Sequence, residues 1–81
     1  MGEKMEELYQ CHHIRVVTEL NPDADCWIPK AEVSWDEDGE QRRQVLTGPP
    51  DFFKIIDEAG IYALEIAKNW IDSLLRKNLA R

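Results

Sequence analysis

Residues 51–79 read DFFKIIDEAGIYALEIAKNWIDSLLRKNL, and this stretch decides the fold because it carries the longest periodic apolar face in the chain. Its apolar side chains recur at every third or fourth position, which places them on one side of an α-helix. Charged side chains such as Glu65 and Arg76 fall on the opposite side. The basic side chains near its C-terminal end, Arg76 and Lys77, interact favourably with the negative end of the helix dipole. The pattern therefore predicts a long amphipathic helix at the C-terminus, within residues 51–79.

The beginning of this helix is less sharply defined than its end. Gly60 costs about 1 kcal/mol relative to alanine inside a helix, so the sequence leaves the start open between Asp51 and Asp57. A start near Ile56 would leave residues 51–55 as a separate turn.

A stripe of small residues runs along the predicted helix. Ala59, Ala63 and Ala67 recur every four positions, so the helix can approach a neighbouring surface closely. Two kinds of surface fit such a stripe. Either the large rings of Trp27 and Trp35 fill it from a sheet of the same chain, or a second helix packs on it in a dimer.

The first half of the chain alternates between apolar and polar residues, which is the period of β-strands. Turn-forming Asn, Asp, Pro and Gly residues separate three such segments. The predicted strands are residues 8–20, 26–35 and 40–47, after a frayed N-terminus at residues 1–7. The expected fold is therefore α+β: a three-stranded antiparallel β-meander packed on one face by the long C-terminal amphipathic helix.

One register between the first two predicted strands pairs apolar residues on the inner face and opposite charges on the outer face. If Leu20 lies opposite Trp27, Arg15 lies opposite Glu32 on the outer face as an attractive charge pair. The inner pairs are then Val16 with Ala31, Ile14 with Val33, and His12 with Trp35. Pro29 cannot donate a ladder hydrogen bond, so it predicts an edge or a bulge in the second strand.

The composition limits the chain to one small domain. At 81 residues and 43% hydrophobic content, the chain can bury a single core and no second one. Ten Lys and Arg against sixteen Asp and Glu give a net charge of -6, which disfavours nucleic acid as a partner. No apolar run has the length of a signal-peptide core or of a membrane span, so we expect a cytoplasmic protein with no membrane partner.

Four residues invite a zinc hypothesis: Cys11, His12, His13 and Cys26. Because side chains alternate between the two faces of a strand, His12 points to the face opposite Cys11 and His13. The register above also places Cys26 far along the strand from Cys11, so the four side chains cannot converge on one metal ion. Cys11 beside His13 also lacks a third residue that would orient an activated thiol. We therefore expect no metal, no cofactor, no small-molecule ligand and no catalytic residue, and we expect both cysteines to be free thiols.

A resemblance supports the same architecture. Residues 53–72 contain Asp57-Glu58-Ala59, Tyr62-Ala63, Ala67 and Trp70-Ile71-Asp72. With these residues the chain resembles the C-terminal helix of small bacterial proteins built as a β-meander followed by one helix, some of them grouped as HlyU-like. The resemblance implies the fold and carries over no functional residue. The transcriptional regulation that the HlyU-like label implies is at odds with the acidic charge if it requires direct DNA contact.

The predicted function is a non-enzymatic protein–protein interaction module whose partner is another protein or a second copy of the chain in a homodimer. Its candidate surface is the margin of the helix, formed by Ile61, Tyr62, Ile66 and Trp70. This margin widens the apolar face beyond what a three-stranded sheet covers, and exposed apolar surface on a small domain is typical of a partner site. An edge strand is the other candidate surface.

The alternative function is a nucleic-acid-linked transcriptional regulator. In that hypothesis Arg15, Arg42 and Arg43 form a local basic strip despite the net charge. The two adjacent arginines lie in residues 40–47, where the sparse apolar content and the charges predict an edge strand protected against aggregation.

Overall fold

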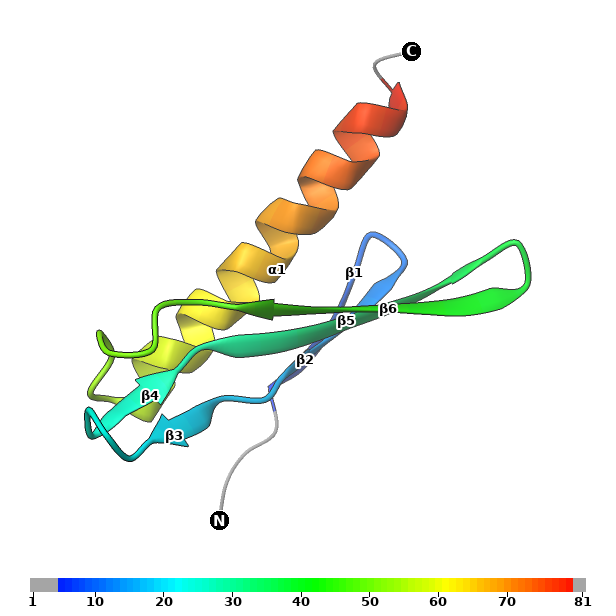
Figure 1. The fold of residues 1–81 in the computed structure, drawn as a ribbon. Coiled ribbons are helices and arrows are strands. Elements are labelled where there is room, and N and C mark those ends of the chain that lie inside the picture. The colour runs from blue at the N-terminus through cyan, green and yellow to red at the C-terminus, as the bar shows by residue number, and fades with distance from the viewer. Residues whose placement is uncertain (1–4, 80–81) are drawn as a thin grey trace.

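The computed structural model describes residues 5–79, which form six strands and one helix (Figure 1). The elements are β1 (Glu6–Tyr9), β2 (His12–Val16), β3 (Glu19–Asn21), β4 (Cys26–Ile28), β5 (Lys30–Glu37), β6 (Glu40–Thr47) and α1 (Ile56–Leu79). All strand pairs are antiparallel. The α+β class and the C-terminal helix are confirmed, whereas the three-stranded meander is wrong, because there are more strands than three.

The strands form a sheet of four in the order β1-β2-β5-β6 and a smaller sheet of two, β3-β4. The predicted register is confirmed, since Leu20 pairs with Trp27 and Arg15 pairs with Glu32. The two sheets belong to one long hairpin, which is interrupted at Pro29 between β4 and β5. Pro29 is fully buried and cannot donate to the ladder, so the strand breaks there, as its sequence position predicted.

The additional strand of the main sheet is β1. The predicted strand over residues 8–20 is in fact divided by a tight turn at Gln10 and Cys11, which both have positive φ (51° and 64°). This turn folds β1 back onto β2, with Tyr9 opposite His12. Glu6 and Glu7 of the predicted frayed N-terminus are therefore strand residues, and residues 1–4 of that prediction lie outside the described residues.

The helix begins at Ile56, within the predicted interval. Residues 51–55 form a separate segment, in which Phe53 makes a single β-bridge to Trp27. A helix that began at Asp51 would have placed Phe52 and Phe53 on its apolar face; both instead precede the helix, and Phe52 is 70% exposed.

The core lies between α1 and the centre of the main sheet. Ala63, Ala67 and Ile71 of the helix form one fully buried cluster with three residues of β2 and β5, namely Ile14, Ala31 and Val33. The alanines of the helix let it approach the sheet closely, so burial of their methyl groups against the aliphatic side chains of β2 and β5 stabilises the contact. A helix-to-helix dimer through the alanine stripe is wrong, because this stripe is buried within the chain.

The two tryptophans of the hairpin do not fill the alanine stripe. Trp35 packs against the edge of the core cluster and lies beside the ring of Trp70. Trp27 lies in β4, where its backbone N–H donates to the Phe53 carbonyl at 2.6 Å. The prediction that both rings cover the stripe is therefore corrected: aliphatic residues of β2 and β5 cover it.

Polar contacts hold α1 against β1. The Tyr9 hydroxyl donates to the Asp72 carboxylate at 2.9 Å, and the Lys68 ammonium lies 2.7 Å from the Glu7 carboxylate. The hydrogen bond to Asp72 raises the pKa of Tyr9, and desolvation and the negative charge of the carboxylate act in the same direction. The helix is thus fastened at the β1 side of the sheet, and in Figure 1 its C-terminal end rises away from the β5–β6 hairpin.

Candidate functional site: a groove beside the free edge of β6

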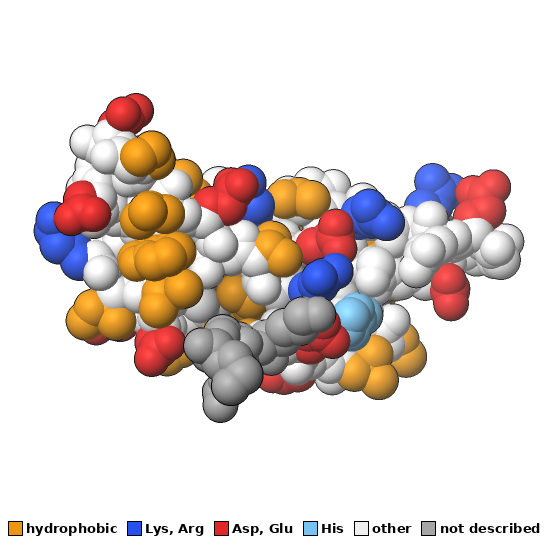
Figure 2. Space-filling model, turned by 90° about the horizontal axis from the view of Figure 1, so that it is seen from below, with side chains coloured by type: hydrophobic (Ala, Val, Ile, Leu, Met, Phe, Trp, Pro, Cys, Tyr) orange, Lys and Arg blue, Asp and Glu red, His pale blue; other side chains and the backbone are white. Residues whose placement is uncertain are grey.

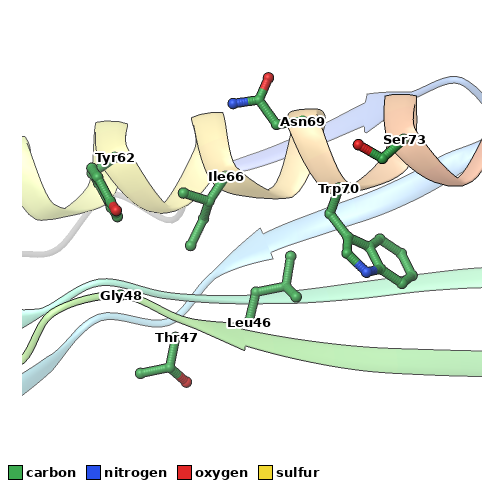
Figure 3. Close-up of a pocket in the computed structure, with 8 residues that line it drawn as sticks. All are labelled: Leu46, Thr47, Gly48, Tyr62, Ile66, Asn69, Trp70 and Ser73. Carbon is green, nitrogen blue, oxygen red and sulfur yellow. The ribbon is translucent and has the colours of Figure 1, made fainter.

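An open groove lies between α1 and β6, on the side of the helix away from β1. Its volume is about 380 Å³. The residues that line it are Leu46, Thr47, Gly48, Tyr62, Ile66, Asn69, Trp70 and Ser73. Figure 3 shows the side chains of Ile66 and Trp70 directed from the helix toward the strands, and the side chain of Leu46 directed from β6 toward the helix. The walls of the groove are therefore mostly aliphatic and aromatic.

Trp70 joins this groove to a second hollow, of about 470 Å³, which lies between the end of the helix and the β5–β6 hairpin. The further lining residues of this hollow are His12, Trp35, Glu37, Gln44, Leu74 and Leu75. The rings of Trp35 and Trp70 lie 5.5 Å apart at an interplanar angle of 52°. A continuous hollowed surface with a tryptophan at its centre is the composition found at the energetic centre of protein interfaces.

The position of the Tyr62 ring depends on Gly48 in the opposite wall of the groove, because glycine has no side chain to displace the ring. A Cβ atom at Gly48 would lie 2.7 Å from Cε1 of Tyr62 and 3.0 Å from Cγ of Pro29. Glycine therefore permits the tyrosine ring to lie directly against the chain at the end of β6. Phe53 supports the same ring from the other side, with centroids 5.1 Å apart.

β6 borders the groove and is an edge strand along its whole length. Its pairing with β5 begins at a two-residue turn, Asp38-Gly39, and the Gly48 N–H donates to the Pro29 carbonyl at 2.8 Å. Even-numbered residues of β6 therefore direct their backbone groups toward β5. The odd-numbered residues, Gln41, Arg43, Val45 and Thr47, direct theirs outward, where no strand of residues 5–79 pairs with them.

The structure brings together three of the four predicted surface residues. Tyr62, Ile66 and Trp70 all line the α1–β6 groove, each half-buried. Ile61 is 52% exposed and does not line it, because it lies one residue before Tyr62 and faces a different side of the helix. Leu46 was not among the predicted surface residues, because its strand is mostly polar and the neighbouring Val45 is also apolar, so the pattern does not show which of the two faces the helix.

The opposite face of the sheet has a different character. Glu6 of β1, Arg15 of β2 and Glu32 of β5 lie opposite one another in register, and Arg43 of β6 lies diagonally beside Glu32, so the charges alternate in sign. Arg15 lies 3.9 Å from Glu6 and Arg43 lies 3.7 Å from Glu32. Figure 2 shows acids and bases interspersed over this face and hydrophobic side chains gathered at the end that carries β3 and β4. The part of the face that carries these charges resembles an ordinary solvated surface.

The proposed basic strip is neutralised by its neighbours. Arg42 lies 3.3 Å from Glu40 and 3.8 Å from Glu37, and Arg15 and Arg43 have the acidic partners named above. These carboxylates lower the local positive potential that attracts phosphate groups. We therefore find no observation that favours a nucleic-acid function.

Cys11 and His13 lie near each other at the turn end of β1 and β2, in a shallow hollow that also includes Asp36. His13 Nε2 lies 3.3 Å from the Glu6 carboxylate, and Cys26 is buried elsewhere. Among the described residues, no three His, Cys, Asp or Glu side chains lie together in a way that could hold a metal ion.

Comparisons with protein-family models, with curated proteins and with solved structures gave no match for this chain. The resemblance to HlyU-like proteins therefore stays a prediction. In the part of the chain that the structure describes, α1 lacks the apolar length needed to cross a membrane.

Proposed function

We propose that this domain is a non-enzymatic protein–protein interaction module. It binds an extended segment of its partner along the free edge of β6, and it receives side chains of that segment in the α1–β6 groove. The observation that carries the proposal is the adjacency of the two features: the groove lined by Leu46, Ile66 and Trp70 lies directly above β6, a long strand whose outer edge pairs with no other strand of residues 5–79.

The two features supply affinity and selectivity in different ways. The outward N–H and C=O groups of Arg43 and Val45 offer main-chain hydrogen bonds to any added strand. Alternate side chains of that strand point to the helix side of the sheet, where the groove receives them. Apolar residues at every second position of the partner segment are therefore the chemistry that this surface selects.

Trp70 is the expected anchor of the complex. It lines both hollows and contacts the ring of Trp35, so a bound side chain that covers it would exclude water from a large aromatic surface. Truncation of such a central aromatic residue costs on the order of 2 kcal/mol or more in binding free energy.

Short peptides selected from a display library on the dilute domain provide the test. The Trp70→Ala variant is expected to bind the selected peptides about 30-fold more weakly. Phe52→Ala is the matched control, because Phe52 is an exposed aromatic residue outside the groove, and it should bind them like the wild type.

A second variant separates loss of the site from loss of the fold. Asn69 is exposed at the mouth of the groove, so Asn69→Arg adds a long charged side chain there and removes no buried contact. We expect this variant to keep the thermal stability of the wild type and to lose peptide binding. Equal binding by Asn69→Arg, or peptide-induced amide shifts on β1 in place of β6, would contradict the proposal.

A further inference from the structure

We infer that the extended segment that β6 binds is β6 of a second copy, so that two chains form one continuous eight-stranded antiparallel sheet. This inference rests on the proposed function, since it names the partner for the same edge and groove. The two-fold axis would pass beside Gln44, perpendicular to the sheet, and both helices would lie on the same face.

The sequence of β6 favours one self-complementary register. The odd-numbered residues, whose backbone groups point away from β5, must form the hydrogen-bonded pairs between the two copies. The residue on the two-fold axis, which is the centre of the pairing, is therefore restricted to a few positions. A centre at Arg43 or Arg42 places two arginines directly opposite each other, which is destabilising. A centre at Val45 shortens the overlap of two strands that end at Thr47.

The centre at Gln44 avoids both problems. It pairs Arg43 of one chain with Val45 of the other, and Gln41 with Thr47, so that every outward residue of β6 has a partner. The two Gln44 side chains then face each other as amides, which can donate to and accept from one another. In the isolated chain the Gln44 amide donates to the Val45 carbonyl at 3.2 Å, and the N–H of the partner's Arg43 would replace it.

The shape of the chain also favours association. Its accessible surface is 6027 Å², against about 5,000 Å² expected for a compact monomer of this mass. The radius of gyration is 13.8 Å, against about 11.7 Å expected for its length. An elongated chain thus leaves surface that association can bury, and each partner in a standard interface buries roughly 800 Å².

The same pairing would bring the two grooves together. Each α1–β6 groove opens over β6, so a second β6 extends its floor and the groove of the second copy continues it on the other side of the axis. Tyr62 and Trp70 of both chains would then face a shared hollow. A closed dimer also removes the long free edge, which otherwise permits unlimited sheet growth.

Light scattering on the full chain at high micromolar concentration is the first test, and we expect twice the 9.5 kDa mass of the chain. Disulfide trapping then tests the register in a Cys11→Ser background. Gln44→Cys should form an interchain disulfide, because facing residues of a non-hydrogen-bonded pair have Cα atoms about 4.5 Å apart, within disulfide range. Val45→Cys is the matched control and should form little, since Val45 faces Arg43.

Arg43→Pro tests the edge itself, with Arg43→Ala as its control. Proline removes an outward N–H and leaves the hydrogen bonds to β5 intact, so we expect it to weaken the dimer about tenfold or more beyond the alanine variant. A monomeric wild type, or a dimer that Gln44→Cys does not trap, would overturn the inference. Peptide binding by a monomeric wild type would overturn only the inference and leave the proposed function standing.

Discussion

At the scale of single residues, Gly48 determines whether the groove keeps its shape. A methyl group at this position would collide with the Tyr62 ring at 2.7 Å and with Pro29 at 3.0 Å, and Pro29 is fully buried. We expect Gly48→Ala to lower the free energy of unfolding by about 1–3 kcal/mol, the usual range for overpacking. Chemical denaturation measures this change.

Gly60 provides the control for that substitution. A methyl group there would crowd the sulfur of the Met5 side chain at 2.8 Å, which can move aside, and would lie at an ordinary contact distance of 3.7 Å from Val16 Cγ1. Alanine also gains about 1 kcal/mol of helix propensity. Gly60→Ala should therefore leave the free energy of unfolding unchanged or raise it. Equal losses in both variants would show that crowding at Gly48 is not the cause.

Tyr9 gives the fold a dependence on alkaline pH. Its pKa is raised from 10.0 by the hydrogen bond to Asp72, so the folded state holds the phenolic proton more tightly than the unfolded state does. The stabilisation is complete below pH 10 and is lost as the pH rises through the higher pKa of the folded state. Denaturation curves of Tyr9→Phe should show less decline in stability over this alkaline range than those of the wild type. An identical decline in both proteins would assign the effect to other groups.

At the scale of secondary-structure elements, the two hairpin turns differ in how well the sequence predicts them. Asp38-Gly39 has the residues that a turn with two positive φ angles requires, and the turn was predicted there. Gln10-Cys11 adopts the same kind of conformation without Gly, Asn or Asp. No local signal marks this turn, so β1 and β2 were predicted as one strand, and the fourth strand of the sheet was missed.

The β1–β2 turn should therefore be strained and open to improvement. A double substitution, Gln10→Asn with Cys11→Gly, supplies the residues that this turn prefers, and we expect it to raise the free energy of unfolding by about 1 kcal/mol. The same glycine substitution at Ser34, within β5, should instead lower it. A loss of stability in the double variant would contradict the positive φ values at residues 10 and 11.

The sequence predicts the residues that α1 contributes to the candidate site, but it does not predict the residue that β6 contributes. The periodicity of α1 identifies Tyr62, Ile66 and Trp70 as an apolar margin, because helical spacing is a strong signal. Leu46 lies in a strand whose polar composition indicates solvent exposure, so its role as the facing wall follows only from the packing of β6 beside α1. Burial of Trp35 against Trp70 likewise depends on the crossing of the helix over the sheet.

At the scale of the whole molecule, one helix covers a four-stranded sheet unevenly. Lys68 and Asp72 fasten α1 to the β1 side, and the covered centre of the sheet belongs to β2 and β5. β6 is therefore left as a long edge strand beside an open hydrophobic groove. The centre of the outer face carries charges of alternating sign, so binding is assigned to the edge and groove together.

Amide hydrogen exchange along β6 tests most directly whether the edge of β6 and the groove bind a partner segment. Exchange is measured on the dilute protein and on the protein saturated with a selected peptide. We predict that the amides of Gln44 and Leu46, which point to β5, are protected in both states. The amides of Arg43, Val45 and Thr47 should exchange rapidly in the dilute protein and become protected in the complex. Rapid exchange at these three outward amides in the saturated complex would contradict the account.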